Sequence, residues 1–361
     1  MKIEILSKLV CPYTQLSFEL IIFEEIKKDI DEVLTGLLIS EKTVYPIIKG
    51  IPRMLPNSAF IFQDIVGLYL HLLTEEQITK YNCYLVNNSL LEKDYKHTQK
   101  SFTAEWKAMG NSDRAWGRHP ESRLNEFINR LDIHPGDLNN KTILDAGCGH
   151  GEIEVALSAY NIELFAIDLS FSVDEVMKRV KDSGSVANIH IIQANVHFLP
   201  FKKDFFDFVF SDGVLHHTPD TKKGFESITY GLKSGGKSFI MVYSNDYKNK
   251  LDLLIDKFIT YNKWFFNNLP HPFLYTICYA LSPIYWIYLN TYNIIHKGSR
   301  RVNRSLKELG LSLFDAFSPK FDWKHSKEEV ISWYKEYGYK DMKLTFFDHI
   351  GIGIVGTKTN N

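Results

Sequence analysis

The feature that most constrains the fold is a regular alternation of short apolar runs with helix-length segments in the middle of the chain. The apolar runs lie at residues 142–146, 163–167, 189–192, 206–211 and 237–243. Strands that alternate with helices in this way form a parallel sheet with helices on both faces. An amphipathic segment at 122–132 precedes the first run, and we expect it to be the first helix of this layer.

Two more apolar runs near the end of the chain, 341–347 and 352–357, are expected to complete the sheet. They follow a predicted helix at 326–337, in which Ser326 and Glu329 fit a capping box. We therefore predict the α/β fold class, with a doubly wound, mainly parallel seven-stranded sheet of the Rossmann-like type.

The remaining segments indicate a small N-terminal domain, a helical layer and an insertion. Short strand-like runs broken by Pro and Gly predict a small α+β domain at the start of the chain. Apolar residues then recur at helical spacing, and a later aromatic-rich segment that interrupts the alternation is also expected to be helical. The predicted boundaries are 1–56, 57–120, 121–244, 245–325 and 326–361.

The strongest functional signal is an apolar strand that opens into three alternating glycines. The segment 142–151 reads TILDAGCGHG, and a helical stretch follows it. Glycines let a turn pass close to a ligand, and the N-terminus of the helix offers free N–H groups to an anion. Asp168 ends the next strand, where a carboxylate can accept both hydroxyls of a ribose. Because Glu152 stands where a dinucleotide fingerprint has its third glycine, we predict a nucleoside ligand without a pyrophosphate.

With these motifs, the segment 142–243 resembles the class I methyltransferases that depend on S-adenosyl-L-methionine (SAM), and especially their quinone- and lipid-type branch. The resemblance implies a Rossmann-like methyltransferase fold with SAM as the cofactor. It implies that Asp145, Gly147 and Gly149 hold the methionine part of SAM and that Asp168 binds its ribose.

Two further motifs carry the same resemblance. The sequence NVHFLPF at 195–201 is similar to the family's adenine-binding signature, which implies contacts from Asn195 and Val196. Asn195 replaces the usual Asp, but its amide oxygen can still accept a hydrogen bond from the adenine amino group. The sequence LKSGG at 232–236 resembles the family's turn before the fifth strand, with Ser234 in place of Pro.

A pair of histidines follows the fourth predicted strand. The resemblance places His216 and His217 near the reacting methyl group. If the acceptor is a hydroxyl or an acidic carbon, a base is needed, and either histidine is a candidate catalytic residue. The alternative is a loop histidine that only packs against the cofactor. Tyr243 and His325 are weaker candidates at the acceptor.

Upstream, the sequence SFTAEW at 101–106 resembles a segment of related methyltransferases whose aromatic side chains fold over SAM, which implies Phe102 and Trp106 at the cofactor. The alternative is two core aromatics at helical spacing. The first 56 residues resemble a small zinc-ribbon-type domain, through CPYT at 11–14 and YPIIKGIP at 45–52. Thr14 stands where a second cysteine is needed, so we expect a degenerate, metal-free module.

The expected insertion contains an unusual stretch, because no Asp, Glu, Lys or Arg occurs from Trp264 to His296. Three prolines and several asparagines interrupt it, which argues against a membrane span. Five cations follow at 297–307, and we expect Arg300, Arg301 and Arg304 to receive an anionic group of a lipid-like acceptor or of a membrane surface. A lid that only packs on the sheet is the alternative.

The leading hypothesis is therefore a methyltransferase for a small-molecule or lipid-like acceptor, without a metal. The alternatives are an RNA or protein methyltransferase that docks through its N-terminal module and a SAM-binding interaction protein without catalysis. A net charge of −1 argues against a surface tuned to nucleic acid. Four widely spaced cysteines and the lack of a signal peptide favour a cytoplasmic location, with possible peripheral association at the inner membrane surface.

Overall fold

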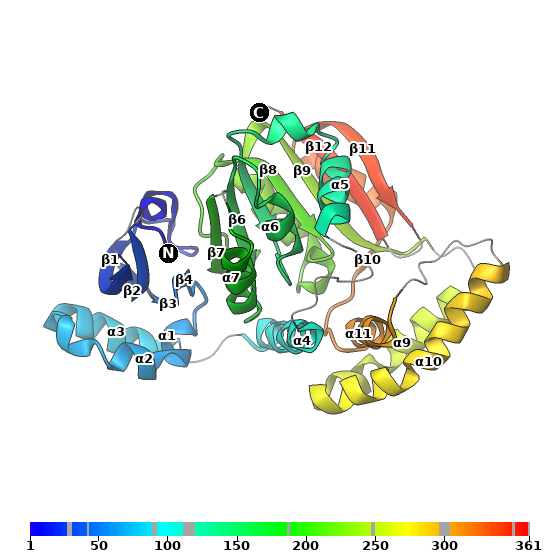
Figure 1. Cartoon of the computed structure of the whole chain (residues 1–361), viewed down its shortest axis with the longest axis horizontal. Coiled ribbons are helices and arrows are strands. Elements are labelled where there is room, and N and C mark those ends of the chain that lie inside the picture. The colour runs from blue at the N-terminus through cyan, green and yellow to red at the C-terminus, as the bar shows by residue number, and fades with distance from the viewer. Residues whose placement is uncertain are drawn as a thin grey trace.

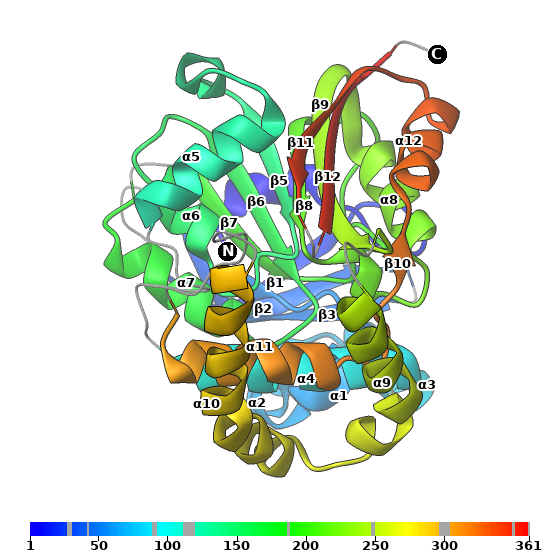
Figure 2. The same ribbon diagram turned by 90° about the vertical axis from the view of Figure 1, so that its right-hand side faces the viewer.

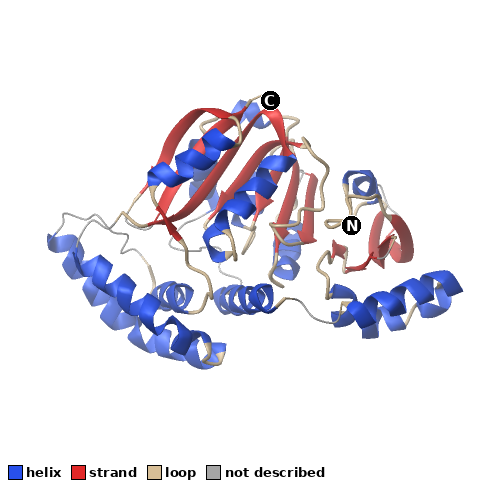
Figure 3. Ribbon diagram, turned by 180° about the vertical axis from the view of Figure 1, so that it is seen from behind, coloured by secondary structure: helices blue, strands red, loops and turns tan. Residues whose placement is uncertain are grey.

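The computed structural model describes residues 1–26, 31–41, 43–88, 92–110, 120–185, 188–246, 250–295, 304–348 and 351–359. A central sheet forms the body of the molecule (Figure 1). The small N-terminal sheet and a pair of long helices lie at opposite ends of it, as the view from behind also shows (Figure 3).

The central sheet has seven strands in the order β11-β12-β9-β8-β5-β6-β7. The strands are β5 (Thr142–Ala146), β6 (Glu163–Asp168), β7 (Asn188–Gln193), β8 (Phe206–Asp212), β9 (Leu232–Ser244), β11 (Tyr339–Phe347) and β12 (Gly351–Lys358). The first five are parallel, while β12 lies antiparallel between β9 and β11. A two-residue strand, β10 (Lys324–His325), pairs with the end of β9. The predicted α/β class and mainly parallel seven-stranded sheet are confirmed.

Helices cover both faces of this sheet, because successive strand residues point to opposite sides. On one face, Ile143 and Leu164 pack against α5 (Pro120–Leu131), α6 (Glu152–Leu157) and α7 (Val173–Asp182). On the other face, Leu144 and Phe165 belong to a core that includes α8 (Thr221–Gly231) and α12 (Lys327–Glu336). Figure 2 shows these two layers on either side of the strands.

The N-terminal module is an antiparallel sheet of β1 (Glu19–Ile26), β2 (Glu32–Ser40), β3 (Thr43–Ile48) and β4 (Ile51–Pro52), with a 3-10 helix η1 (Ile3–Lys8). It is joined to the edge strand β7, where the Met54 N–H donates to the Gln193 carbonyl at 2.7 Å. The buried Arg53 guanidinium donates to both carboxylate oxygens of Asp174 on α7, at 2.6 and 3.1 Å. No cluster of three or more potential metal ligands occurs in the part of the chain that the structure describes.

A helical layer connects this module to the central sheet. It comprises α1 (Ser58–Ile61), α2 (Gln63–Gly67), η2 (Leu70–Leu72), α3 (Glu75–Asn87) and α4 (Lys93–Met109). The last of these, α4, lies across the end of the sheet at which the parallel strands finish (Figure 1).

The insertion after β9 is helical, and consists of α9 (Lys250–Asn267), α10 (His271–Ile295) and α11 (Leu306–Phe317). Helix α11 lies beside α4 beneath the sheet, while α9 and α10 both pack on the outer side of α11 (Figure 1). Figure 2 shows that α9 and α10 diverge from the turn that joins them. Among the described helices, none is both long and apolar enough to span a bilayer.

Candidate active site

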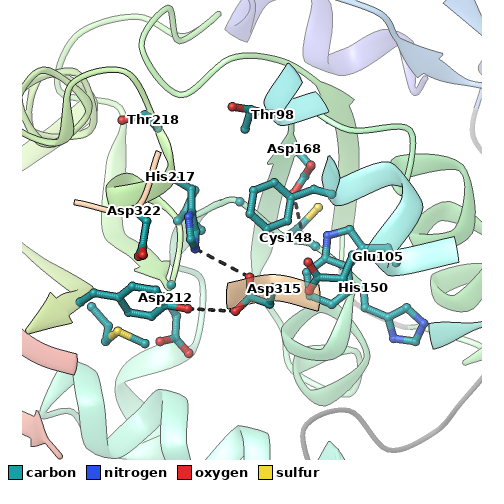
Figure 4. A pocket seen from close by; sticks show the side chains of 18 of the residues that line it. Thr98, Glu105, Cys148, His150, Asp168, Asp212, His217, Thr218, Asp315 and Asp322 are labelled. Atoms are coloured by element: carbon teal, nitrogen blue, oxygen red, sulfur yellow. Dashed lines mark hydrogen bonds and ion pairs between the residues drawn. The ribbon is translucent and has the colours of Figure 1, made fainter. Parts of the chain in front are cut away.

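A cavity of about 510 Å³ lies at the carboxyl ends of β5 and β8, where the strand order reverses. Ligands of open α/β sheets bind at such reversal points. Three parts of the chain form its walls: the loops of the sheet, helix α4, and the insertion helices α9, α10 and α11. Figure 4 shows the side chains that meet there.

The glycine loop after β5 forms the floor of the cavity. Gly147, Gly149 and Gly151 have φ angles of 101°, 51° and 81°, which explains the alternating glycines because other residues rarely adopt them. The Gly149 N–H donates to Asp168 Oδ2 at 2.9 Å. A Cβ atom on Gly149 would stand only 2.7 Å from the Trp106 ring. The loop is therefore shaped by its own glycines and covered by Trp106.

Asp168 lies at the end of β6 on the wall of the cavity. Its Oδ1 accepts hydrogen bonds from the Ser170 backbone N–H at 2.8 Å and from the Ser170 hydroxyl at 2.6 Å. Two carboxylate oxygens offer about four acceptor positions, so these bonds and the one from Gly149 leave one for a ligand. Asp168 is held in place to accept a further hydroxyl.

Asn195 and Val196 line the same cavity beyond Asp168. The Asn195 amide oxygen accepts from the His197 backbone N–H at 3.0 Å, which orients the side chain. Tyr95 reaches this region from α4, and its hydroxyl is 3.0 Å from His197 Nδ1. The residues predicted to hold the cofactor thus follow one another along one side of the cavity.

Helix α4 covers the glycine loop and closes that side of the cavity. Phe102 and Trp106 both line it, and the Phe102 ring centroid is 5.2 Å from that of His217. Between them Glu105 is 1% exposed, and its Oε2 has no hydrogen-bond partner among the described residues. Burial, with nearby Asp315 and Asp168, raises the pKa of Glu105 well above its ordinary value. A buried, unpaired carboxyl group of this kind suits a cationic ligand.

His217 and an aspartate of the insertion face each other across the cavity. The His217 Nδ1 lies 2.9 Å from the Phe321 carbonyl oxygen, which can only accept a hydrogen bond, so Nδ1 carries the proton. The other nitrogen, Nε2, is thus free to accept a proton and lies 3.9 Å from Asp315 Oδ1 (Figure 4). The Tyr243 hydroxyl donates to Asp315 Oδ2 at 2.9 Å and fixes the carboxylate.

Asp315 comes from α11, far along the chain from His217. Burial raises the pKa of Asp315, while His217 and the Tyr243 hydroxyl partly offset that rise. No sequence motif marks this aspartate, and it was not among the predicted site residues. The same holds for Glu105 and for the buried pair Arg123 and Asp212, which also line the cavity.

Two of the predicted residues do not line the cavity. His216 is completely buried behind His217, with its ring 3.8 Å from that of Tyr243, and burial lowers its pKa well below the ordinary value. The geometry therefore favours His217 over His216 as the base, and the role of His216 stays a prediction. His325 is also buried outside the cavity, where Nε2 is 3.0 Å from the Thr221 hydroxyl and Nδ1 is 3.0 Å from Glu329. Its position outside the cavity does not support a role at the acceptor, and that role stays a prediction.

Of the three predicted arginines, Arg304 lines the cavity and donates to the Ser312 hydroxyl at 2.8 Å. Arg300 and Arg301 lie outside the described residues. Tyr243 lines the cavity as expected, although its hydroxyl is engaged by Asp315.

The charge of the cavity lining fits SAM, which carries a sulfonium and an ammonium group against one carboxylate. Among the described side chains of the lining, carboxylates outnumber cations by nine to four. Asp145 lies near the glycine loop beside Glu154, and burial raises the pKa of both carboxyl groups. A bound cation would favour their ionised forms, so the residues present suit this cofactor.

Comparison with known proteins agrees with this geometry. Residues 144–240 match the family described as "Methyltransferase domain". Two curated relatives are named ubiquinone/menaquinone biosynthesis C-methyltransferase UbiE. The one from Wigglesworthia glossinidia brevipalpis is 30% identical over 173 residues, covering 47% of this chain and 66% of the relative. The one from Vibrio vulnificus is 30% identical over 120 residues, covering 32% and 46%. The chain thus spans about half to just under two thirds of the relatives' length.

Solved structures with partial similarity include a magnesium protoporphyrin IX methyltransferase from Synechocystis with bound SAH (TM-score 0.45, 12% identity, 74% of this chain and 100% of that chain). Another is phosphoethanolamine N-methyltransferase 2 of Haemonchus contortus in complex with SAM (TM-score 0.42, 16% identity, 74% and 59%). The sheet order, the glycine loop and the domain match lead to one conclusion: the chain carries a class I methyltransferase domain, of the kind that uses SAM.

Proposed function

We propose that this protein transfers a methyl group from SAM to a small, apolar or lipid-like acceptor that carries a removable proton. The observation that supports this proposal is a single cavity with the cofactor motifs at one end and His217 and Asp315 at the other. The acceptor end is walled by Ile259, Tyr285 and Leu289 of the insertion, which suits an apolar molecule. The names of the two relatives, from quinone biosynthesis, agree with such an acceptor.

The cofactor would lie along the loop side of the cavity. The positive φ angles of Gly147 and Gly149 let the loop pass close to its methionine part, and Asp145 balances its positive charge. Asp168 accepts a ribose hydroxyl, and Asn195 accepts from the adenine amino group. When bound there, SAM supplies a methyl group already activated by the sulfonium.

The protein's own contribution is to align the acceptor, exclude water and remove a proton. His217 Nε2 takes the acceptor's proton, because Nδ1 is held as a donor to Phe321. Asp315 then stabilises the imidazolium across 3.9 Å, and Tyr243 keeps the carboxylate turned toward it. Helices α4 and α11 cover the site, so the reacting atoms are shielded from solvent.

A screen with SAM labelled in its methyl group tests this proposal. Purified protein is incubated separately with lipid extract, total RNA and total protein, and the label in each fraction is counted. We expect label in the lipid fraction, with a His217→Gln variant as the background control. Label in RNA or protein alone would overturn the acceptor class, and no label in any fraction, with SAM bound, would overturn the enzymatic role.

A further inference from the structure

Helices α9 and α10, which diverge from the turn that joins them, both turn apolar side chains outward. Of the 27 large hydrophobic side chains that are exposed in the described part of the chain, 13 lie on these two helices. Six of them define what we call the apolar face: Phe258, Tyr261, Trp264, Ile284, Ile287 and Ile294, with exposures from 59% to 88%. Soluble monomers rarely expose so many large apolar side chains on two successive helices, so this face is expected to meet another apolar phase.

The polarity of α9 is inverted relative to an ordinary surface helix. Asp256 forms an ion pair with Lys324, and Lys263 lies 3.4 Å from Asp322, so both charged side chains point toward the body of the protein. Lys257 is the only other charged side chain described on the two helices, since α10 contains no Asp, Glu, Lys or Arg. Two of the three charged side chains described on α9 are thus paired inside, Lys257 is exposed, and large apolar side chains face out.

The same two helices also form part of the wall of the candidate active site. Ile259 of α9 and Tyr285, Tyr288 and Leu289 of α10 line the cavity. The cavity and the apolar face are therefore the two sides of one thin layer of helices. An acceptor dissolved in an apolar phase outside would meet the protein next to the site at which it reacts.

We propose that the apolar face inserts into the interface of a phospholipid bilayer and that the acceptor is taken from that bilayer. The proposal rests on the proposed function, because it assumes a lipid-like acceptor. Trp264 and Tyr261 are the side-chain types that favour the membrane–water interface. Interfaces with protein partners usually have a polar rim around an apolar centre. The described residues of α10 include no charged side chain that could form such a rim. Helix α10, roughly 37 Å long at 1.5 Å per residue, lies along the bilayer surface rather than across it.

Vesicle co-sedimentation of the full chain tests this placement. The probe is sucrose-loaded vesicles of phosphatidylcholine with phosphatidylglycerol, and the variant carries Tyr261→Gln, Trp264→Gln and Ile287→Gln, none of which lines the cavity. The matched control carries Leu68→Gln, Leu72→Gln and Val86→Gln, which are 69%, 52% and 81% exposed on the N-terminal helical layer. We expect wild type and control to bind equally and the face variant to bind at least tenfold more weakly.

The placement would be overturned if the wild type did not sediment with vesicles, or if the face variant bound vesicles like the wild type. It would also be overturned if light scattering showed a wild-type dimer that the face variant converts to a monomer. The last would assign the face to a second copy of the chain. SAM titration and thermal melts of each variant show that it is folded. Vesicle binding without label in any lipid fraction would refute the proposed function and the bilayer as the source of the acceptor, but not the placement of the apolar face. Label in detergent-solubilised lipid without vesicle binding would refute this inference alone.

Discussion

Replacing Gly149 by alanine tests how the cofactor loop is built. Gly149 has a φ of 51°, where an alanine costs roughly 1–2 kcal/mol of backbone strain, partly offset by the loss of about 0.4–1 kcal/mol of unfolded-chain freedom. The new Cβ would also stand 2.7 Å from Trp106 Cζ2. Overpacking of this kind adds about 1–3 kcal/mol. We therefore expect Gly149→Ala to lower the free energy of unfolding by about 2–4 kcal/mol.

Gly184→Ala is the matched control. Gly184 has a similar φ of 62°, but nothing lies within 4 Å of its ideal Cβ. Its substitution therefore carries the same strain without the collision, and we expect a loss of about 1 kcal/mol or less. The difference between the two variants isolates the contact with Trp106.

The assays are urea unfolding and SAM calorimetry. Because the Cβ pushes Trp106 away from the loop, we expect at least tenfold weaker SAM binding in Gly149→Ala, about 1.4 kcal/mol, and unchanged binding in Gly184→Ala. In a Trp106→Leu background the collision disappears, so the double-mutant cycle should show a coupling of about 1–3 kcal/mol. Equal losses in Gly149→Ala and Gly184→Ala, or additivity with Trp106→Leu, would refute this reasoning.

Four further predictions concern single residues. Asp168→Ala should weaken SAM binding more than tenfold in calorimetry, and its melting temperature should fall because Gly149 and Ser170 lose hydrogen bonds while the protein stays folded; equal affinity would contradict its assignment to the ribose. His217→Gln should lower kcat by roughly 10²–10⁴-fold with unchanged SAM affinity, and Asp315→Asn should lower kcat less, because the imidazolium loses only its counter-charge; unchanged kcat in His217→Gln would exclude this base. With no second ligand beside Cys11, purified protein should contain no stoichiometric zinc, and elemental analysis finding one zinc per chain would contradict this. Burial lowers the pKa of His150 to about 4, so the neutral form is favoured by folding and stability should fall as pH drops from about 6.5 toward 4; melts of His150→Gln should show a smaller fall, and identical curves would argue against it.

Local patterns were sufficient for the sheet and for the cofactor loop. Each strand of the central sheet was marked by its own apolar run, and β5 occupies residues 142–146 as predicted. The glycine loop could be recognised because all its conformational requirements lie within a few consecutive residues, where positive φ angles select glycine. Asp168 followed from its place at the end of the next strand.

The local sequence could not show which histidine of the pair His216 and His217 reaches the cavity. His216 and His217 are adjacent and chemically identical, and the motif gave no means of choosing between them. The 3-10 turn Leu215–His217 and the stacking of His216 on Tyr243 decide which ring is buried and which reaches the cavity. Those contacts come from neighbouring strands, so they exist only in the folded protein.

The sequence by itself therefore determined the parallel sheet, the glycine loop and the type of cofactor, because each depends on residues close together in the chain. Only the tertiary structure decided that Asp315 meets His217, since α11 must first pack beside α4 beneath the sheet. It also decided which side of the charge-free stretch faces outward, because both sides of α10 are apolar and only packing against α11 distinguishes them. Long-range packing is a property of the whole chain, and no short segment encodes it.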